Sequence, residues 1–141
     1  LEYTVKRLTS HPMNVAKPYI PLVNVAPLVE RVRIPPSKNA ESTFARRIKT
    51  VTEIVDYEKY KIISEWNPVD DTFTIDLNNS VHIKKIASRR GLETARVLDE
   101  LQNRSNFLKD LMNKGIHKNV EIAKHITNYY GQLNHQGGLR K

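Results

Sequence analysis

Histidine and paired carboxylates are the residues here that could act as general bases or metal ligands. The five histidines stand far apart in the sequence, and His117 and His125 are too widely spaced for the four-residue interval that puts two ligands on one helix face. Asp70 and Asp71 are adjacent, but they follow an Asn-Pro pair and are typical of a turn. We therefore predict no catalytic residue and no metal site in this chain.

The sequence also lacks the short motifs of the common enzyme classes. It contains no GxxxxGK(S/T) phosphate loop, no GxGxxG, no HExxH and no GxSxG. It has no cysteine, which excludes disulfides, thiolate zinc sites and cysteine nucleophiles. Phosphoryl transfer needs a phosphate-binding loop and magnesium ligands. We expect this chain alone to be inactive in that chemistry and to hold no cofactor.

Arginines are the remaining candidates, because a guanidinium group can hold a carboxylate or a phosphate with two bonds. Arg46 and Arg47 are neighbours in a β-branched run, so their side chains point to opposite faces of a strand. At most one of them can face a given partner. The alternative is that these arginines are solvated, or that they pair with a carboxylate within the sheet such as Glu53.

The composition is that of an ordinary globular protein of one domain or two small ones. The chain has 141 residues, of which 39% are hydrophobic and 27% charged, and no apolar run is long enough to span a bilayer. The net charge is +8, but the basic excess is spread evenly over both halves. A nucleic-acid-binding surface needs clustered basic groups, so we expect no nucleic-acid partner.

The elements that must position these side chains change in character near Asn78. Before it, the residues are typical of strands and proline-rich loops. We expect the end of a helix before His11-Pro12, and a loop with at most one short turn over 17–27. A further loop is expected over 35–42. The strands are predicted at 28–34, 43–57, 60–68 and 72–77.

Three helices are expected after Asn78, because the apolar residues then recur with helical spacing. Asn79 or Ser80 can cap the first helix, and Gly91 suits its left-handed end. The second is predicted to run from Thr94 to Lys114 and to be closed by Gly115, and the third to run from an Asn119 cap to Gly131. The predicted buried stripes are Val97, Leu98, Leu101, Leu108, Leu111 and Met112 on the second helix and Ala123, Ile126 and Tyr130 on the third.

The fold class predicted from these elements is α+β. A small β-rich segment, residues 1–78, precedes a three-helix bundle, residues 79–141. A second interpretation of the bundle is a basic helix-turn-helix-like module that binds nucleic acid, since Gly91 separates two helices. The exposed face of the second helix is close to neutral, which disfavours phosphate binding.

Five segments of the chain resemble, in order, the C-terminal end of archaeal type II/IV secretion-system motor ATPases, the family that drives archaella and type IV pili. The resemblance runs from about Tyr3 to Tyr130. An Arg-Leu followed by Pro-Met-x-Val is matched by Arg7, Leu8, Pro12, Met13 and Val15. An Arg-Arg strand ending in Glu-Ile is matched by Arg46, Arg47, Val51, Glu53 and Ile54. A Trp-x-Pro followed by Asp and Phe is matched by Trp66, Pro68, Asp71 and Phe73. The helical pair that follows is matched by Ile86, Ala87, Gly91, Glu100, Leu101, Arg104 and Leu108, and the closing helix by the double tyrosine at 129–130.

Two departures from the family pattern are visible. The segment PPSKNAEST is longer than the expected turn, and Glu93 stands where a Ser or Thr cap is more usual. The tail LNHQGGLRK matches no part of the pattern.

This resemblance implies a parent protein that is a hexameric P-loop ATPase using ATP and magnesium. Such a parent is cytoplasmic, lies peripheral to the membrane and pushes on a membrane platform protein. The chain would supply the last strands of a RecA-like sheet and a helical appendage, and would contact neighbouring subunits of the homo-hexamer. The resemblance also implies that Arg7, Arg46, Arg47 and Glu53 lie near the nucleotide or at a subunit interface.

Overall fold

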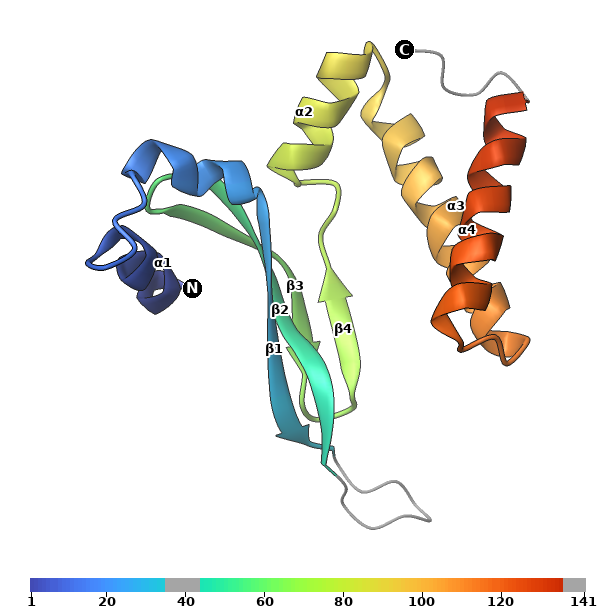
Figure 1. Ribbon diagram of the computed structural model, residues 1–141, viewed down its shortest axis with the longest axis horizontal. Helices are drawn as coiled ribbons and strands as arrows, with labels where there is room; N and C mark the ends of the chain where they lie inside the picture. The colour runs from blue at the N-terminus through green and yellow to red at the C-terminus, as the bar shows by residue number, and fades with distance from the viewer. Residues whose placement is uncertain (35–43, 136–141) are drawn as a thin grey trace. The chain divides into compact units, whose positions relative to one another are not determined.

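The computed structural model describes residues 1–34 and 44–135, which divide into two compact units between Lys85 and Ile86. The loop expected over 35–42 therefore lies outside the described residues. The fold class is α+β, as predicted, with a small antiparallel sheet preceding the helices (Figure 1). No helix in the described ranges is both long enough and apolar enough to cross a membrane.

The first unit is built on a four-stranded antiparallel sheet with the strands in sequence order, β1-β2-β3-β4. All four predicted strands are present, with modest shifts of their ends. The helix before Pro12 is also confirmed. In chain order the elements are α1 (Glu2–Thr9), the 3-10 helix η1 (Lys17–Val23), β1 (Val25–Arg33), β2 (Phe44–Asp56), β3 (Lys59–Asn67) and β4 (Thr72–Ile75).

The segment expected to be a loop with one short turn is more ordered than predicted. Residues Lys17–Val23 form η1, with Pro18 in its first turn, and β1 begins at Val25. A 3-10 helix tolerates this sequence because proline fixes φ near the helical value and the first turn needs no N–H from it. The prolines of this segment are therefore compatible with a short 3-10 helix.

The core of the first unit lies where α1 and η1 cover one end of the sheet (Figure 1). Val5 of α1, Ile20 of η1 and Ile54 of β2 are buried together, and Leu8, Val15, Ala26, Tyr57 and Tyr60 pack around them. Each of the three elements contributes one buried aliphatic side chain. This small cluster fixes α1 and η1 on the sheet.

Three helices follow: α2 (Val81–Arg90), α3 (Thr94–Asn113) and α4 (Asn119–His135). Ser80 caps α2, because its Oγ accepts a hydrogen bond from the Ile83 N–H at 3.0 Å. Gly91 and Gly115 follow α2 and α3 with φ of +62° and +70°, the left-handed region that glycine adopts without strain. These stops are as predicted. The boundary between the two units lies inside α2.

The predicted buried stripe of α3 is wrong for three of its leucine and methionine positions. Val97 and Leu111 are buried, but Leu101, Leu108 and Met112 are exposed. The contact between α3 and α4 instead uses Phe107, whose ring stacks on Tyr129 with centroids 4.4 Å apart. Leucine periodicity missed this face because an aromatic residue carries the contact.

The prediction for α4 is also corrected. The helix begins with Asn119 as its first helical residue, and it continues through Gly131 to His135. Ile126 is half-buried, as expected, whereas Ala123 and Tyr130 are exposed. The Arg104 guanidinium lies over the Tyr130 ring at 5.6 Å. Tyr130 therefore covers a cation on α3 rather than filling an apolar core.

Candidate functional site

Arg47 makes a two-bonded ion pair with Asp71 in the turn between β3 and β4. Arg47 Nε donates to Asp71 Oδ1 at 2.8 Å, and Arg47 Nη2 donates to Oδ2 at 2.7 Å. Trp66 Nε1 donates to the same Oδ1 at 2.7 Å. Asp71 has a φ of +56°, so the turn holds it in the left-handed region. One carboxylate thus ties β2, β3 and the β3–β4 turn together.

The electrostatics of this cluster favour the charged form of each partner. Hydrogen bonds from Arg47 and then from Trp66 lower the pKa of Asp71 to about 2. The same contact raises the pKa of Arg47. Both groups are therefore ionised at neutral pH, and the carboxylate oxygens are already occupied by donors. The cluster has the chemistry of a structural clamp and not of a general acid or base.

Glu53 is a buried carboxylate at the start of α2, with 1% of its surface exposed. Its Oε1 accepts a short hydrogen bond from the Ser80 hydroxyl. Its Oε2 accepts from the Val81 N–H at 2.8 Å, and Oε1 accepts a longer bond from the His82 N–H at 3.3 Å. The first N–H groups of a helix have no partner within the helix and favour an anion. Glu53 satisfies them from the neighbouring strand.

Two opposing effects set the ionisation of Glu53. Burial by itself raises the pKa of the carboxyl, but the hydrogen bonds from Ser80, Val81 and His82 lower it, and the net direction is down. The charged form is therefore the one stabilised in the folded protein. Two further contacts fix the same junction: His82 Nε2 lies 3.3 Å from the Ile54 carbonyl oxygen, and Lys61 Nζ donates to the Asn79 carbonyl at 2.6 Å.

Arg46 lies on the opposite face of β2 from Arg47, as the spacing predicted. Its cross-strand partner is Arg31 of β1. Both side chains are exposed, and the Arg31 guanidinium lies 5.0 Å over the ring of Phe44. Within residues 1–34 and 44–135, the ion pairs of this sheet include neither Arg31 nor Arg46.

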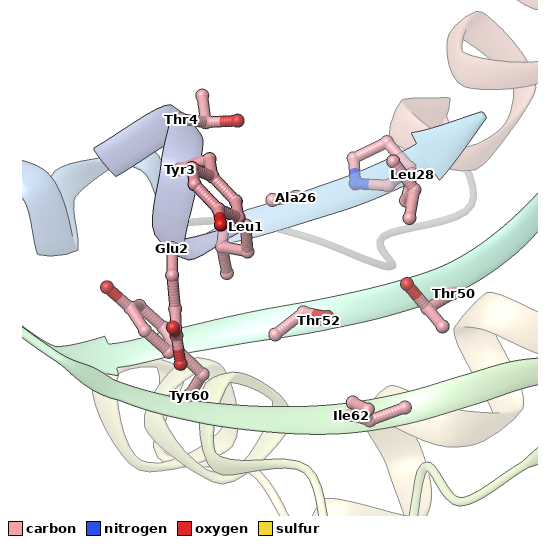
Figure 2. Close-up of a pocket in the computed structure, with 11 residues that line it drawn as sticks. Leu1, Glu2, Tyr3, Thr4, Ala26, Leu28, Thr50, Thr52, Tyr60 and Ile62 are labelled. Atoms are coloured by element: carbon pink, nitrogen blue, oxygen red, sulfur yellow. The ribbon is translucent and has the colours of Figure 1, made fainter. Parts of the chain in front are cut away.

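Arg7 is exposed on α1, and it borders a hollow of about 530 Å³ that Ser10, His11, Pro12 and Met13 also line. A second cavity, of about 500 Å³, lies between the start of α1 and the sheet (Figure 2). Tyr3 of α1, Leu28 of β1, Thr50 and Thr52 of β2, and Tyr60 and Ile62 of β3 face it. Its wall is mostly apolar, and the polar residues that line it are Glu2, three threonines (Thr4, Thr50 and Thr52) and the two tyrosines.

The four arginine and glutamate residues singled out in the sequence are thus not gathered into one site. Arg47 and Glu53 are each held by partners within the first unit, whereas Arg7 and Arg46 are exposed. Sequence reasoning placed Asp71 in a turn but missed its role as the partner of Arg47, and it missed Arg31 altogether. The alternation of charges along 28–34 was the available signal for Arg31. Among the residues that the structure describes, no group of three potential ligands could hold a metal ion.

These features define an α+β protein in which two charged clusters, around Asp71 and Glu53, connect neighbouring elements. Separately, Arg31 and Arg46 lie exposed on one face of the sheet. No protein-family profile matches the chain. It is 32% identical over 117 residues to the uncharacterized protein MJ1287 of Methanocaldococcus jannaschii. That alignment covers 78% of this chain and 40% of the relative, so the chain spans well under half of the length of the protein that it matches.

Proposed function

We propose that the chain is the C-terminal portion of a hexameric secretion or motility ATPase of archaeal type. The observation that carries this proposal is the order and spacing of the five resembling segments along residues 3–130. The chain would complete the motor core and contribute contacts between subunits.

The geometry supports different roles for two pairs of residues: Arg47 with Glu53, and Arg7 with Arg46. Arg47 and Glu53 already have carboxylate, hydroxyl and N–H partners within the chain, so their role in the motor is to hold β2, the β3–β4 turn and α2 in place. Arg7 and Arg46 are exposed and can meet the nucleotide surroundings or a neighbouring subunit. The exposed leucines of α3 would suit a contact with the membrane platform protein.

ATP and magnesium belong to the parent in this proposal, because the phosphate loop and the acidic magnesium ligands are absent from this sequence. The parent would work in the cytoplasm against the inner surface of the membrane. The chain itself then contributes rigidity and contact surfaces to the reaction and moves no proton or phosphoryl group.

The test compares the full-length parent protein with the isolated 141-residue chain. Phosphate release is measured with ATP and magnesium, and the assembly state is measured by native mass spectrometry. We expect turnover and hexamers from the parent, and no phosphate release above background from the chain. A parent without ATP hydrolysis, or a chain whose turnover survives repurification, would contradict the proposal.

The same preparations test the nucleic-acid alternative. Arg90 and Arg104 both pair with Glu100 in the second unit, at 3.2 and 3.5 Å, which removes two cations from a phosphate-binding face. We therefore expect no mobility shift of a DNA duplex at physiological salt. A shift that disappears steeply as salt rises would instead support the helix-turn-helix interpretation.

A further inference from the structure

The cavity between the start of α1 and the sheet continues the core of the first unit along one sheet face (Figure 2). Cross-strand partners share a face, and Thr52 of β2 lies between Ala26 of β1 and Ile62 of β3. Ile54, two residues further along β2, belongs to the same face and is buried against Val5 of α1. The cavity is therefore a part of this face that α1 does not cover. Its volume of about 500 Å³ lies within the range of small-molecule sites.

Thr52 is a buried polar residue that lines this cavity without a hydrogen-bond partner for its side chain. Only 7% of its surface is exposed, and it lies on β2 below the start of α1 (Figure 2). Its hydroxyl makes no hydrogen bond with any other residue that the structure describes. Burial of a hydroxyl without a hydrogen bond costs free energy. A polar group that enters the cavity and bonds to Thr52 removes that cost, so this residue points to a ligand with a polar atom.

The charge along the wall of the cavity is negative. Of the side chains described there, only that of Glu2 is charged, and it reaches from α1 toward Tyr60 (Figure 2). Within residues 1–34 and 44–135, the Glu2 carboxylate makes no ion pair. Burial raises the pKa of Tyr60, and the nearby Glu58, Tyr57 and Glu2 raise it further. An anionic ligand is therefore disfavoured here, and a cationic one is favoured.

The rest of the wall decides what kind of cation fits. Ala26, Pro27, Leu28 and Ile62 make the wall mostly apolar, and an inorganic cation makes no use of such a surface. An ammonium group donates up to three hydrogen bonds, which a carboxylate and a threonine hydroxyl can accept. The face of a tyrosine ring also attracts such a cation. An organic amine with an apolar body therefore matches both the charge of Glu2 and the apolar wall.

We propose that this cavity binds a small organic amine, whose ammonium group is held by Glu2 and Thr52 and whose apolar body lies along Leu28 and Ile62. The binding site is formed by this chain alone and does not depend on the proposed ATPase function. Phenethylamine is a suitable probe, because it joins one ammonium group to an apolar ring. Phenylethanol and phenylpropionate are its neutral and anionic counterparts. In a titration followed by the amide NMR shifts of the isotope-labelled chain, phenethylamine should shift residues around the cavity and bind more tightly than either counterpart.

Two substitutions separate ligand recognition from folding. Glu2→Gln removes the charge and should weaken the binding of phenethylamine about fivefold, the effect of losing an exposed ion pair. The matched control, Glu121→Gln, makes the same change in the first turn of α4 and should bind phenethylamine normally. Thr52→Val keeps the shape of the side chain but removes its hydroxyl, and should weaken binding about tenfold. Its urea midpoint should stay the same or rise, because the lost hydroxyl has no partner within the described chain.

Three results would overturn the inference. Equal affinity for phenethylamine and phenylethanol, or an unchanged affinity in the folded Glu2→Gln variant, would show that the ammonium group is not recognised. NMR shifts that spread over both units without including the cavity would show that the probe binds elsewhere. A Thr52→Val variant that is less stable than the wild type would show that the hydroxyl serves the fold and not a ligand.

Discussion

Arg46 and Arg47 are consecutive residues with opposite surroundings. Arg47 is fixed by two bonds to Asp71, while Arg46 faces outward beside Arg31. The alternation of a strand predicts that they lie on opposite faces, and that much follows from the sequence. Which of them finds a carboxylate depends on the β3–β4 turn, which returns Asp71 to β2 from 24 residues away. Local patterns carry no information about such a long-range pair.

The Asp71 carboxylate should make the folded protein sensitive to acid. Its pKa is lowered to about 2 from an ordinary value of 3.8, so the unfolded chain binds this proton more readily than the folded one does. The stabilisation is thus fully present above about pH 4 and is lost as the pH falls toward 2. We expect the urea midpoint of the wild type to fall more between pH 5 and pH 2 than that of Asp71→Asn.

Trp66 provides the measurement, because it is the single tryptophan of the chain and donates to Asp71. Asp70→Asn is the matched control, since Asp70 only accepts hydrogen bonds from Thr72, which an asparagine oxygen can also accept. Identical acid sensitivity in the wild type and in Asp71→Asn would show that the ion pair contributes nothing to stability.

At the scale of elements, chain periodicity and end signals predicted most of the fold. The strands were predicted from the alternation of β-branched residues. The helix ends were predicted from Ser80, Gly91 and Gly115, because a cap or a left-handed glycine acts on the adjacent helical turn. The 3-10 helix over Lys17–Val23 was missed because proline spacing resembles that of a loop. The face of α3 was missed because Phe107 and Arg104, and not a leucine, meet the tyrosines of α4.

The link between β2 and α2 should be costly to break at Glu53. Glu53→Ala leaves the Ser80 hydroxyl and the first N–H groups of α2 without their acceptor, and we expect a loss of about 1–3 kcal/mol in the free energy of unfolding. Ser80→Ala removes the cap but leaves the carboxylate on the helix N–H groups, so about 1 kcal/mol is expected. Urea denaturation at pH 7 measures both. A Glu53→Ala variant as stable as the wild type would contradict this account of the junction.

The corrected face of α3 gives a second stability prediction. Leu111 is 4% exposed and Leu108 is 51% exposed, on the same helix and of the same residue type. Leu111→Ala should therefore lower the free energy of unfolding by about 2–5 kcal/mol. Leu108→Ala serves as the control, with an expected loss below about 1 kcal/mol. Equal losses at the two positions, measured by urea denaturation, would mean that the helix face is wrongly assigned.

At the scale of the whole molecule, the chain has the character of a module. Its N-terminal unit has a three-residue buried aliphatic cluster and a sheet face with exposed apolar side chains. The alignment of the chain with its archaeal relative covers only 40% of that relative. The proposed parent rests on a resemblance of sequence segments, whereas the cross-strand contact of Arg31 with Arg46 becomes visible only when the strand register is known. The register of β1 against β2 makes Arg31 and Arg46 direct neighbours, and no local sequence signal fixes that register.

Under the proposed function, Arg7 acts in the parent protein and not in the isolated chain. It is exposed on α1, so removing it should cost little folding stability. We expect Arg7→Ala in the full-length protein to lower ATP turnover while leaving the thermal midpoint nearly unchanged. Turnover is measured by phosphate release at saturating ATP and stability by circular dichroism. Unchanged turnover in an intact ring would assign Arg7 a purely local role.

The buried contact between Glu53 and Ser80 also has an evolutionary consequence. The two residues are 27 positions apart, yet neither can change alone without leaving a buried polar group unpaired. A lineage that replaces Glu53 by an apolar residue must supply another acceptor for the start of α2, and its most direct route is a new side chain at position 80. Among homologues, positions 53 and 80 should therefore be inherited as a pair, and chimaeras that join β2 of one homologue to α2 of another should be more stable when the pair matches than when it does not.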